Sequence, residues 1–512
     1  MARRNKSRHL AKATEDVRAR YDAASTSRRM AGWSTPSSGP NAAVTGLQKI
    51  RDRTRDLQRN EWSGAASVRI WTTNVIGTGI IPRLRTKSAD LKTKINDLWT
   101  KWVPEADADQ VLDFYAMQAL VARSWFTSGE CFARLRPRRV SDGLTVPMQV
   151  QILESDMVPL LDADVYAGLP KGNKIRQGIE LDSIGRKVAV WFWKQHPGEP
   201  RTEIDASLLS RVPAESVCHI YEVLRPGQLR GIPEMASVVA KLKNVGDFDD
   251  AVLTRQHLAN LFTLFVTKPF PSGASDVMTG QAFVGDPNDP IAALEPGSSM
   301  ELIPGEDVKF STPPDAGANY DQYMRTQMLG VAAGTGTPYE LLTGDLKDVS
   351  DRTLRIILNE FHRLCEVRQW HMLIPQFCTK VRNAWVDMAV LSGDIAMSEM
   401  ADAKNVEWAP HAWPYIHPVQ DVQGKKLEVE AGFKSRTGVI SSRGDDPEAV
   451  DQERADDKKR EDDLGLTPPP PPDPAASPEA KKAEAKALSH INVLLEKTES
   501  NERTIAALGV TQ

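Results

Sequence analysis

The hydrophobic pattern of this chain changes its period near residue 128, and this change constrains the fold more than any other feature of the sequence. Between about 128 and 230, apolar residues alternate with polar residues or proline, as they do along a half-buried strand. On either side they recur at steps of three or four, as on one face of a helix. The alternation is clearest at Val146, Met148, Val150 and Ile152. The pattern predicts an α+β fold with a β-rich centre.

Helices are predicted for much of the chain outside this centre. The first begins near Val44. A second follows Pro233, a favourable residue for a first helical turn, and runs to about Phe262. A third covers Tyr320 to Ala333 and is stopped by the run Gly334 to Pro338. The longest extends from Ser350 to near Leu391.

Proline, glycine and charge mark the remaining segments. Pro375 lies inside the longest predicted helix, where it removes a backbone donor and predicts a kink. Hairpins are predicted around 181–188 and within 302–310. Residues 393–464 are typical of short helices that end in a strongly charged one from Glu448 to Asp463. A stiff polyproline linker and a Lys/Glu/Ala-rich tail follow it.

The charge balance excludes a protein that grips nucleic acid over its whole surface. The chain carries 64 Lys and Arg against 68 Asp and Glu, so any DNA contact must be local or weak. Residues 1–60 are basic, and this arm is either a solvated face or a contact for nucleic acid or a partner ring. No secretory signal follows the charged N-terminus, and the run Leu261 to Val266 is too short to span a bilayer. No membrane partner is expected.

The sequence offers no catalytic residues, no metal site and no cofactor site. It lacks a phosphate-binding GxxxxGK[ST] loop, so it carries no motor ATPase motif. Cys218 and His219 are adjacent in a predicted strand, point to opposite faces, and cannot form a nucleophile–base pair. The carboxylates of Glu154 and Asp156 have no nucleophile near them in the sequence. The four cysteines are scattered, which predicts buried thiols and neither disulfides nor zinc.

A series of short blocks, in order along residues 15–465, resembles the lambda-type portal family of tailed bacteriophages. The blocks are Tyr21–Ala24 with Arg28, Arg29 and Trp33; Leu47–Asn60; Asn74–Pro82; Ser128–Glu130; Gln151–Asp156; His219 with Tyr221; Arg225–Pro233; Ala332–Asp345; and Trp408, Pro410, Ile416–Pro418, Gly432 and Gly444–Asp446. Each block alone is weak, whereas so many in register are specific. One departure is Val349 to Asp351, where the family usually has a Tyr-Ser-Ser run.

The resemblance implies a portal protein, one subunit of a ring-shaped DNA channel at a single capsid vertex. The implied roles are genome packaging, head–tail joining and DNA ejection, without catalysis. The implied partners are further copies of the chain in a dodecameric ring, double-stranded DNA, the terminase large subunit, the major capsid or scaffold protein, and a head–tail connector. The implied location is the virion, after assembly in the host cytoplasm.

The resemblance also implies a division of the α+β portal fold into wing, stem, clip, channel loop and crown. Mapped onto this chain, the parts are 1–60 arm and first helix; 61–232 wing; 233–262 stem helix; 263–318 clip; 319–335 stem helix; 336–349 channel loop; 350–392 long kinked helix; 393–465 crown; 466–475 polyproline linker; and 476–512 tail.

A channel through which DNA slides cannot hold phosphates tightly, because each neutralised phosphate adds affinity. We therefore predict transient phosphate contacts at Lys347 and Arg352, with Asp345, Asp348 and Asp351 keeping the net attraction low. The alternative is a capped helix start, with Ser350 or Asp351 as the N-cap.

Two other classes of protein compete with the channel subunit. A packaging enzyme, such as a terminase-like ATPase or nuclease, would hydrolyse ATP when purified. Another head or tail structural protein would not form a ring with a central hole.

Overall fold

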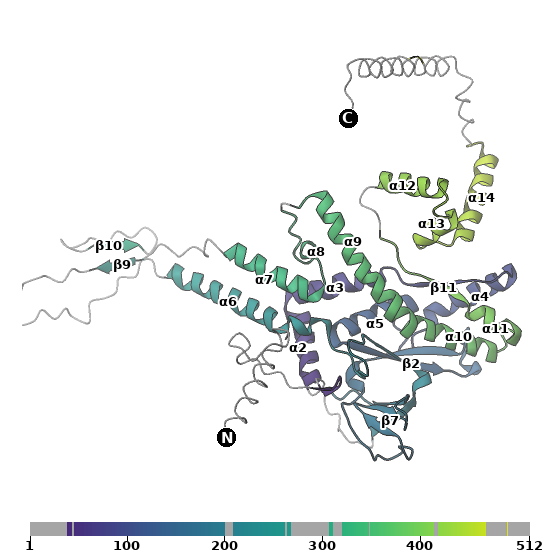
Figure 1. Cartoon of the computed structure of the whole chain (residues 1–512), viewed down its shortest axis with the longest axis horizontal. Coiled ribbons are helices and arrows are strands. Elements are labelled where there is room, and N and C mark those ends of the chain that lie inside the picture. The colour runs from purple at the N-terminus through teal and green to yellow at the C-terminus, as the bar shows by residue number, and fades with distance from the viewer. Residues whose placement is uncertain are drawn as a thin grey trace, which may run out of the picture. The chain divides into compact units, whose positions relative to one another are not determined.

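The computed structural model describes residues 38–42, 46–199, 208–261, 264–267, 307–310, 320–347, 349–413, 418–466 and 489. Contacts divide the chain into two units, residues 1–426 and 427–512, and each is considered by itself. Several predictions fall outside the described residues: most of the basic arm, nearly all of the clip, Asp348, the polyproline linker and nearly all of the tail. Within the described part, the predicted mixture of helices and sheets is confirmed (Figure 1).

The described part of the first unit begins with four helices: α2 (Leu47–Asn60), α3 (Trp62–Ile76), α4 (Ala89–Trp102) and α5 (Phe114–Ser128). α5 begins at Asp113, whose side chain accepts from the Ala116 amide, and ends at Gly129 in the left-handed conformation. Helices α2, α3 and α5 contact one another; α3 and α5 bury their apolar faces in the largest hydrophobic cluster, and Leu57 of α2 packs against it. The predicted change of period is confirmed, because α5 ends at Ser128 and the first long strand begins two residues later.

A three-stranded antiparallel sheet follows, in the order β3-β2-β8. Its strands are β2 (Glu130–Pro137), β3 (Met148–Leu153) and β8 (Val217–Tyr221). Alternation sends Cys131 and Ala133 of β2 into the helical cluster, whereas Phe132 between them enters a second cluster on the other face. The predicted burial of Val146, Met148 and Val150 on the helical side is confirmed.

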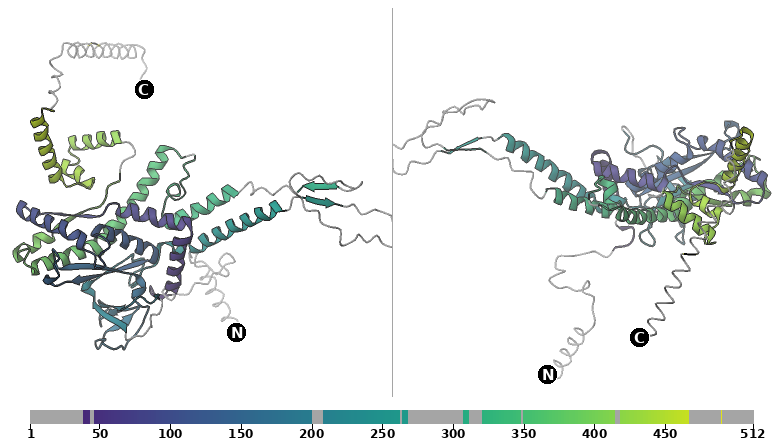
Figure 2. Two further views of the ribbon diagram at one scale, coloured as in Figure 1. Left: turned by 180° about the vertical axis from the view of Figure 1, so that it is seen from behind. Right: turned by 90° about the horizontal axis from the view of Figure 1, so that it is seen from above.

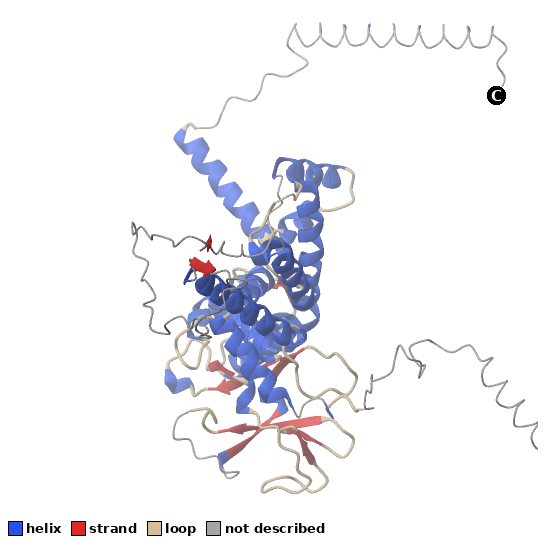
Figure 3. Ribbon diagram, turned by 90° about the vertical axis from the view of Figure 1, so that its left-hand side faces the viewer, coloured by secondary structure: helices blue, strands red, loops and turns tan. Residues whose placement is uncertain are grey.

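The second cluster lies between this sheet and a four-stranded antiparallel sheet in sequence order, β4 (Lys174–Arg176), β5 (Ile179–Leu181), β6 (Lys187–Trp193) and β7 (Leu209–Pro213). The predicted hairpin at 181–188 is confirmed, with Leu181 opposite Lys187. The alternation of Val188, Val190 and Phe192 predicts that they share a face; Val190 and Phe192 are buried in the second cluster, and Val188 is partly buried. The unit is therefore layered as helices, three strands and four strands, and Figure 3 shows these strands grouped below the helices.

Helices α6 (Val239–Leu261) and α7 (Tyr320–Thr335) run side by side (Figures 1 and 2). The helix predicted from Pro233 begins later, because residues Glu234–Ser237 form a 3-10 turn. α7 ends at the predicted stop, where Gly336 has a φ of +68°. Strand β10 (Asp307–Phe310) pairs with β9 (Leu264–Thr267). The first arm of the hairpin predicted within 302–310 lies outside the described residues, and the strand at its second arm, β10, pairs with a segment about forty residues earlier in the chain.

The longest predicted helix is confirmed as α9 (Asp351–Arg368) and α10 (Thr379–Leu391), joined by π-helical residues Gln369–Cys378. Pro375 lies inside the π-helical segment, where the wider winding accommodates a residue without a backbone donor. The segment 336–349 was predicted to be a loop. This was wrong for α8 (Tyr339–Thr343), a short helix that begins directly after Pro338.

A strand was missed near the C-terminal end of the first unit. After α11 (Met400–Lys404), β11 (Val406–Ala409) pairs with β1 (Ile81–Leu84) in an antiparallel register. Short helices alone had been predicted for 393–464. Trp408 of β11 is buried in the main cluster, so this part of the chain packs with segments more than three hundred residues earlier.

The last described helices are α12 (Pro418–Glu430), α13 (Arg436–Ser442) and α14 (Pro447–Leu464). The predicted charged helix is confirmed as α14, which is capped by the Asp446 side chain. No described side chain between 427 and 466 is buried. Among the helices that the structure describes, none combines the length and the apolar character that crossing a membrane requires.

Candidate functional site

The two cations predicted to touch DNA lie where α8 leads into α9. Lys347 and Arg352 are exposed, and neither side chain forms an ion pair with another described residue.

The acids of the same set are engaged locally. Asp345 accepts from the Tyr339 hydroxyl at 3.0 Å and from the Lys347 amide at 3.0 Å. The bond from this amide is the main reason that the pKa of Asp345 is lowered. Ser350 is the N-cap of α9, as the alternative interpretation predicted, because its hydroxyl accepts from the Thr353 amide at 3.2 Å. Asp351 pairs with Arg355 one turn later.

A buried ionic network that the sequence did not predict lies at the start of β2. Glu130, Arg51 and Arg230 have fully buried side chains. Glu130 Oε1 accepts from Arg51 Nη2 and from Arg230 Nε at 2.7 Å, and Oε2 accepts from His219 Nε2 at 2.9 Å and from the Gly231 amide at 2.9 Å. One carboxylate therefore joins α2, β2, β8 and the 230 loop.

Electrostatics keep this network ionised and leave it no labile proton at neutral pH. Burial alone would raise the pKa of Glu130, but Arg230 and Arg51 overcome burial and hold it well below its usual range. Burial lowers the pKa of His219 to about 4, so the imidazole is neutral and donates its Nε2 proton to Glu130. Cys218, its neighbour in β8, faces the helical cluster, and the predicted opposite orientation of these two residues is confirmed.

Arg230 also binds the chain around it through backbone carbonyls. Its Nη1 donates to the carbonyl of Gln177 at 2.7 Å, and its Nη2 donates to the carbonyl of Ser155 at 3.0 Å. A charged group inside a protein is stable only when its donors and its charge are both matched. Because Arg230 also pairs with Glu130, these bonds connect the turn between β4 and β5 and the turn after β3 to the start of β2.

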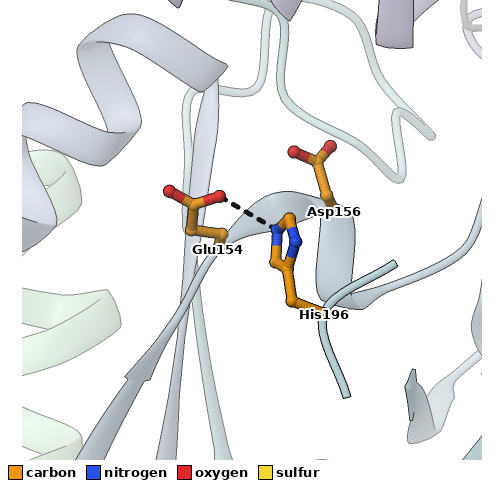
Figure 4. Close-up of side chains that lie close together, drawn as sticks. All are labelled: Glu154, Asp156 and His196. Carbon is orange, nitrogen blue, oxygen red and sulfur yellow. Dashed lines mark hydrogen bonds and ion pairs between the residues drawn. The ribbon is translucent and has the colours of Figure 1, made fainter. Parts of the chain in front are cut away.

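A second group of charged side chains surrounds Asp156, which lies in the short turn after β3. Arg55 of α2 pairs with Asp156, and its Nη2 lies 3.5 Å from Glu154 Oε2. His196 Nε2 lies 3.2 Å from the same Glu154 oxygen (Figure 4). Glu154, Asp156 and His196 offer ligand atoms within 4.8 Å of one another. However, Arg55 and Arg51 already neutralise these carboxylates, so a divalent cation would add uncompensated positive charge. The arrangement is an ion-pair cluster, in which a metal ion would have to displace the Arg55 guanidinium group.

A hollow of about 540 Å³ lies beside the network and is bordered by Gln177, Lys187 and Leu229. The segment 38–42 closes one side of it. Asn41 donates to the Gly227 carbonyl at 3.0 Å and accepts from the Leu229 amide at 2.9 Å. The chain that leads out of the basic arm is thus anchored to the loop that carries Arg230.

The members of the network come from blocks on which the family resemblance rests. Arg51 and Arg55 lie in 47–60, Glu130 in 128–130, Asp156 in 151–156 and Arg230 in 225–233. A signal was available in the first block. Leu47, Arg51 and Thr54 form the buried face of α2, so a charged residue interrupts the apolar stripe and indicates a buried partner.

Comparison with known proteins agrees with the resemblance. Residues 26–369 match the family described as phage portal protein, lambda family. A probable portal protein of Halomonas phage phiHAP-1 is 24% identical, over 87% of this chain and 85% of that protein. The portal protein of Escherichia phage N15 is 21% identical, over 86% and 90%. Portal protein B of Escherichia phage lambda is 21% identical, over 57% and 60%.

Solved structures with a similar chain come from gene transfer agent (GTA) particles. A chain in the neck of the native particle, computed with C12 symmetry, covers 81% of this chain at 16% identity, with a TM-score of 0.44. A chain in the neck of the empty particle, computed with C6 symmetry, has a TM-score of 0.43. The assignment rests on the family match, which spans well over half of the chain. The chain belongs to the lambda family of phage portal proteins.

Proposed function

We propose that copies of this chain form the ring-shaped channel through which DNA enters and leaves a phage capsid. The observation that carries the proposal is the family match over residues 26–369. In this proposal the chain contributes no chemistry of its own. The buried network around Glu130 supports that view, because its charges are paired and its histidine is neutral.

The proposed assembly is a dodecamer at one vertex of the virion, formed in the host cytoplasm. Its proposed partners are duplex DNA, the terminase large subunit, the capsid or scaffold protein and a head–tail connector. The proposed parts keep the boundaries predicted from the sequence: wing to 232, stem helices 233–262 and 319–335, clip 263–318, channel loop 336–349, long helix 350–392 with its kink at Pro375, and crown 393–465. The side-by-side arrangement of α6 and α7 supports a paired stem.

Imaging of the purified chain tests the proposal. Negative-stain images are expected to show rings with a central hole, because a head-to-tail contact that closes generates a ring. An assay for ATP hydrolysis on the same sample is expected to give no activity above background. Monomers in the images together with ATP hydrolysis would contradict the proposal and favour a packaging enzyme.

Single-molecule packaging tests the proposed DNA contacts. The changes are Lys347→Ala and Arg352→Ala, with Lys87→Ala as the matched control because Lys87 is equally exposed. An exposed ion pair contributes at most ~1 kcal/mol, so each loop change is expected to raise the frequency of DNA slippage by no more than about fivefold. The control is expected to leave slippage unchanged. Velocity and slippage equal to those of the wild type in both loop variants would remove both residues from the mechanism.

A further inference from the structure

Two carboxylates share one guanidinium group where three elements of the first unit meet. Arg368, the last residue of α9, donates from Nη1 to Glu234 Oε1 at 2.8 Å and from Nη2 to Glu234 Oε2 at 3.3 Å. The same Nη1 pairs with Glu222, which directly follows β8. Glu234 opens the 3-10 turn before α6. Arg368 therefore joins the end of the three-stranded sheet, the turn leading into α6, and α9.

The surroundings of Arg368 are apolar and leave the three charges unbalanced. The indole rings of Trp71 and Trp125 lie 5.6 and 5.1 Å from the guanidinium carbon. Cys365, one turn earlier in α9, stays protonated because burial raises the pKa of its thiol to about 12. With both carboxylates ionised, the site holds one positive and two negative charges, of which Arg368 and Glu234 are largely buried and Glu222 is partly exposed. With one of the two carboxyls protonated, the charges balance.

Other charged groups near this turn do not correct the imbalance. Arg51 of α2 is committed to Glu130, and Arg325 of α7 lies over the Tyr339 ring. Lys241 of α6 lies against α7 at Gly330, and Arg123 of α5 is exposed. Arg368 and Glu222 are the charged groups that act most on Glu234. The net charge at this site therefore depends mainly on Glu222, Glu234 and Arg368.

We propose that Glu222, Glu234 and Arg368 form a proton-operated latch that holds the turn before α6 to α9 when one carboxyl is protonated and loosens when both are ionised. The step is the binding or release of one proton, with no other reactant. The latch concerns the angle between elements within one subunit, so it goes beyond the proposed channel function and can fail without it.

The pH range of the latch follows from the acid pair. Burial, with Glu222 adding to it and Arg368 opposing it, raises the pKa of Glu234 from 4.5 to about 7. Between pH 4.5 and about pH 7, Glu234 holds a proton in the folded chain that it has lost in the unfolded chain. The stabilisation is thus complete below 4.5 and lost as pH rises through about 7. Over that range the unfolding equilibrium constant is expected to rise by up to about tenfold per pH unit on account of this group.

Thermal unfolding of the full chain, followed from about pH 5 to pH 8.5, tests the latch. The changes are Glu234→Gln and Glu222→Gln, since each leaves one carboxylate for one guanidinium. Glu360→Gln is the matched control, because Glu360 forms an exposed pair with Arg363 on the same helix. Relative to the wild type, both latch variants are expected to gain melting temperature at the alkaline end, whereas the control follows the wild type throughout.

Infrared spectroscopy supplies a second measurement, which detects protonation directly and would show no pH-dependent band if Glu234 had only a structural role. The wild-type chain is expected to show a protonated carboxyl band at pH 6 that fades near pH 7 and is missing from Glu234→Gln. If Glu234→Gln does not fold, Glu222→Gln provides both measurements, because removal of the neighbouring charge returns the Glu234 titration toward 4.5. A wild-type chain without that band, or latch variants with the wild-type pH profile, would overturn the proposal.

Discussion

Replacement of Gly129 by alanine is expected to destabilise the chain by about 3–5 kcal/mol, because two separate costs fall on one position. Gly129 has a φ of +83°, which an L side chain rarely adopts. An added Cβ would also overlap the backbone where Ile232 joins Pro233. At this crossing the start of β2 and the 230 loop approach backbone to backbone, and both carry residues of the Glu130 network. The change therefore disturbs the site as well as the turn.

Gly143→Ala separates the two costs. Gly143 has a φ of +78°, but its Cβ would meet no atom within 4 Å. Its replacement is expected to cost ~1–2 kcal/mol, the penalty for the left-handed conformation alone. The free energy of unfolding, measured by denaturant titration of both variants, gives the comparison. Equal losses in the two variants would show that the close approach at Gly129 contributes nothing.

The second large effect is expected for Glu130→Gln, a change of charge with almost no change of shape. It would leave Arg230 buried without a counter-charge and would leave Arg51 with Asp156 alone, 3.7 Å away, since Glu130 is the carboxylate that pairs with both arginines. Removing one partner of a buried ion pair costs about 3–5 kcal/mol. The loss is measured as the change in free energy of unfolding at neutral pH, where Glu130 is ionised.

Glu360→Gln again provides the matched control, because its pair with Arg363 is exposed. Exposed pairs contribute ~0–1 kcal/mol, so the two losses should differ severalfold. A cost below ~1 kcal/mol for Glu130→Gln would mean that the buried arginines find other partners, and the network would no longer explain how α2 is held to the sheet.

Local patterns predicted much of the fold correctly. The change of period placed the first long strand directly after α5, and alternation identified which residues of β3 and β6 face the core. The stop at Gly334 to Pro338 ended α7 as expected. These features succeed because they depend on neighbours within a few residues, where backbone geometry and side-chain periodicity act directly.

Pairings over long distances escaped prediction. β1 and β11 are four residues each and lie more than three hundred residues apart, so neither carries a pattern that names its partner. Strand formation depends on the neighbour that a segment meets, more than on its own residues. The same reason explains why the pairing of β10 with β9 was not predicted.

The two candidate sites also differ in whether the sequence could predict them. The loop residues Lys347 and Arg352 were chosen from charge near a predicted turn, and the DNA contact remains a prediction. The Glu130 network was missed although Arg51 stands in the apolar stripe of α2, because a stripe cannot show which acid lies opposite. The Arg368 latch was missed for the same reason.

By itself the sequence determined the helical and β-rich regions, the helix stop, the lack of a phosphate-binding loop and the family, which the match over residues 26–369 confirms. Only the tertiary structure decided which charges meet: Arg51 with Glu130, and Arg368 with Glu222 and Glu234. The physical reason is range. Periodicity acts along the chain, whereas the energy of a charge depends on distance through space and on the water excluded around it, and both are set only when distant segments pack together.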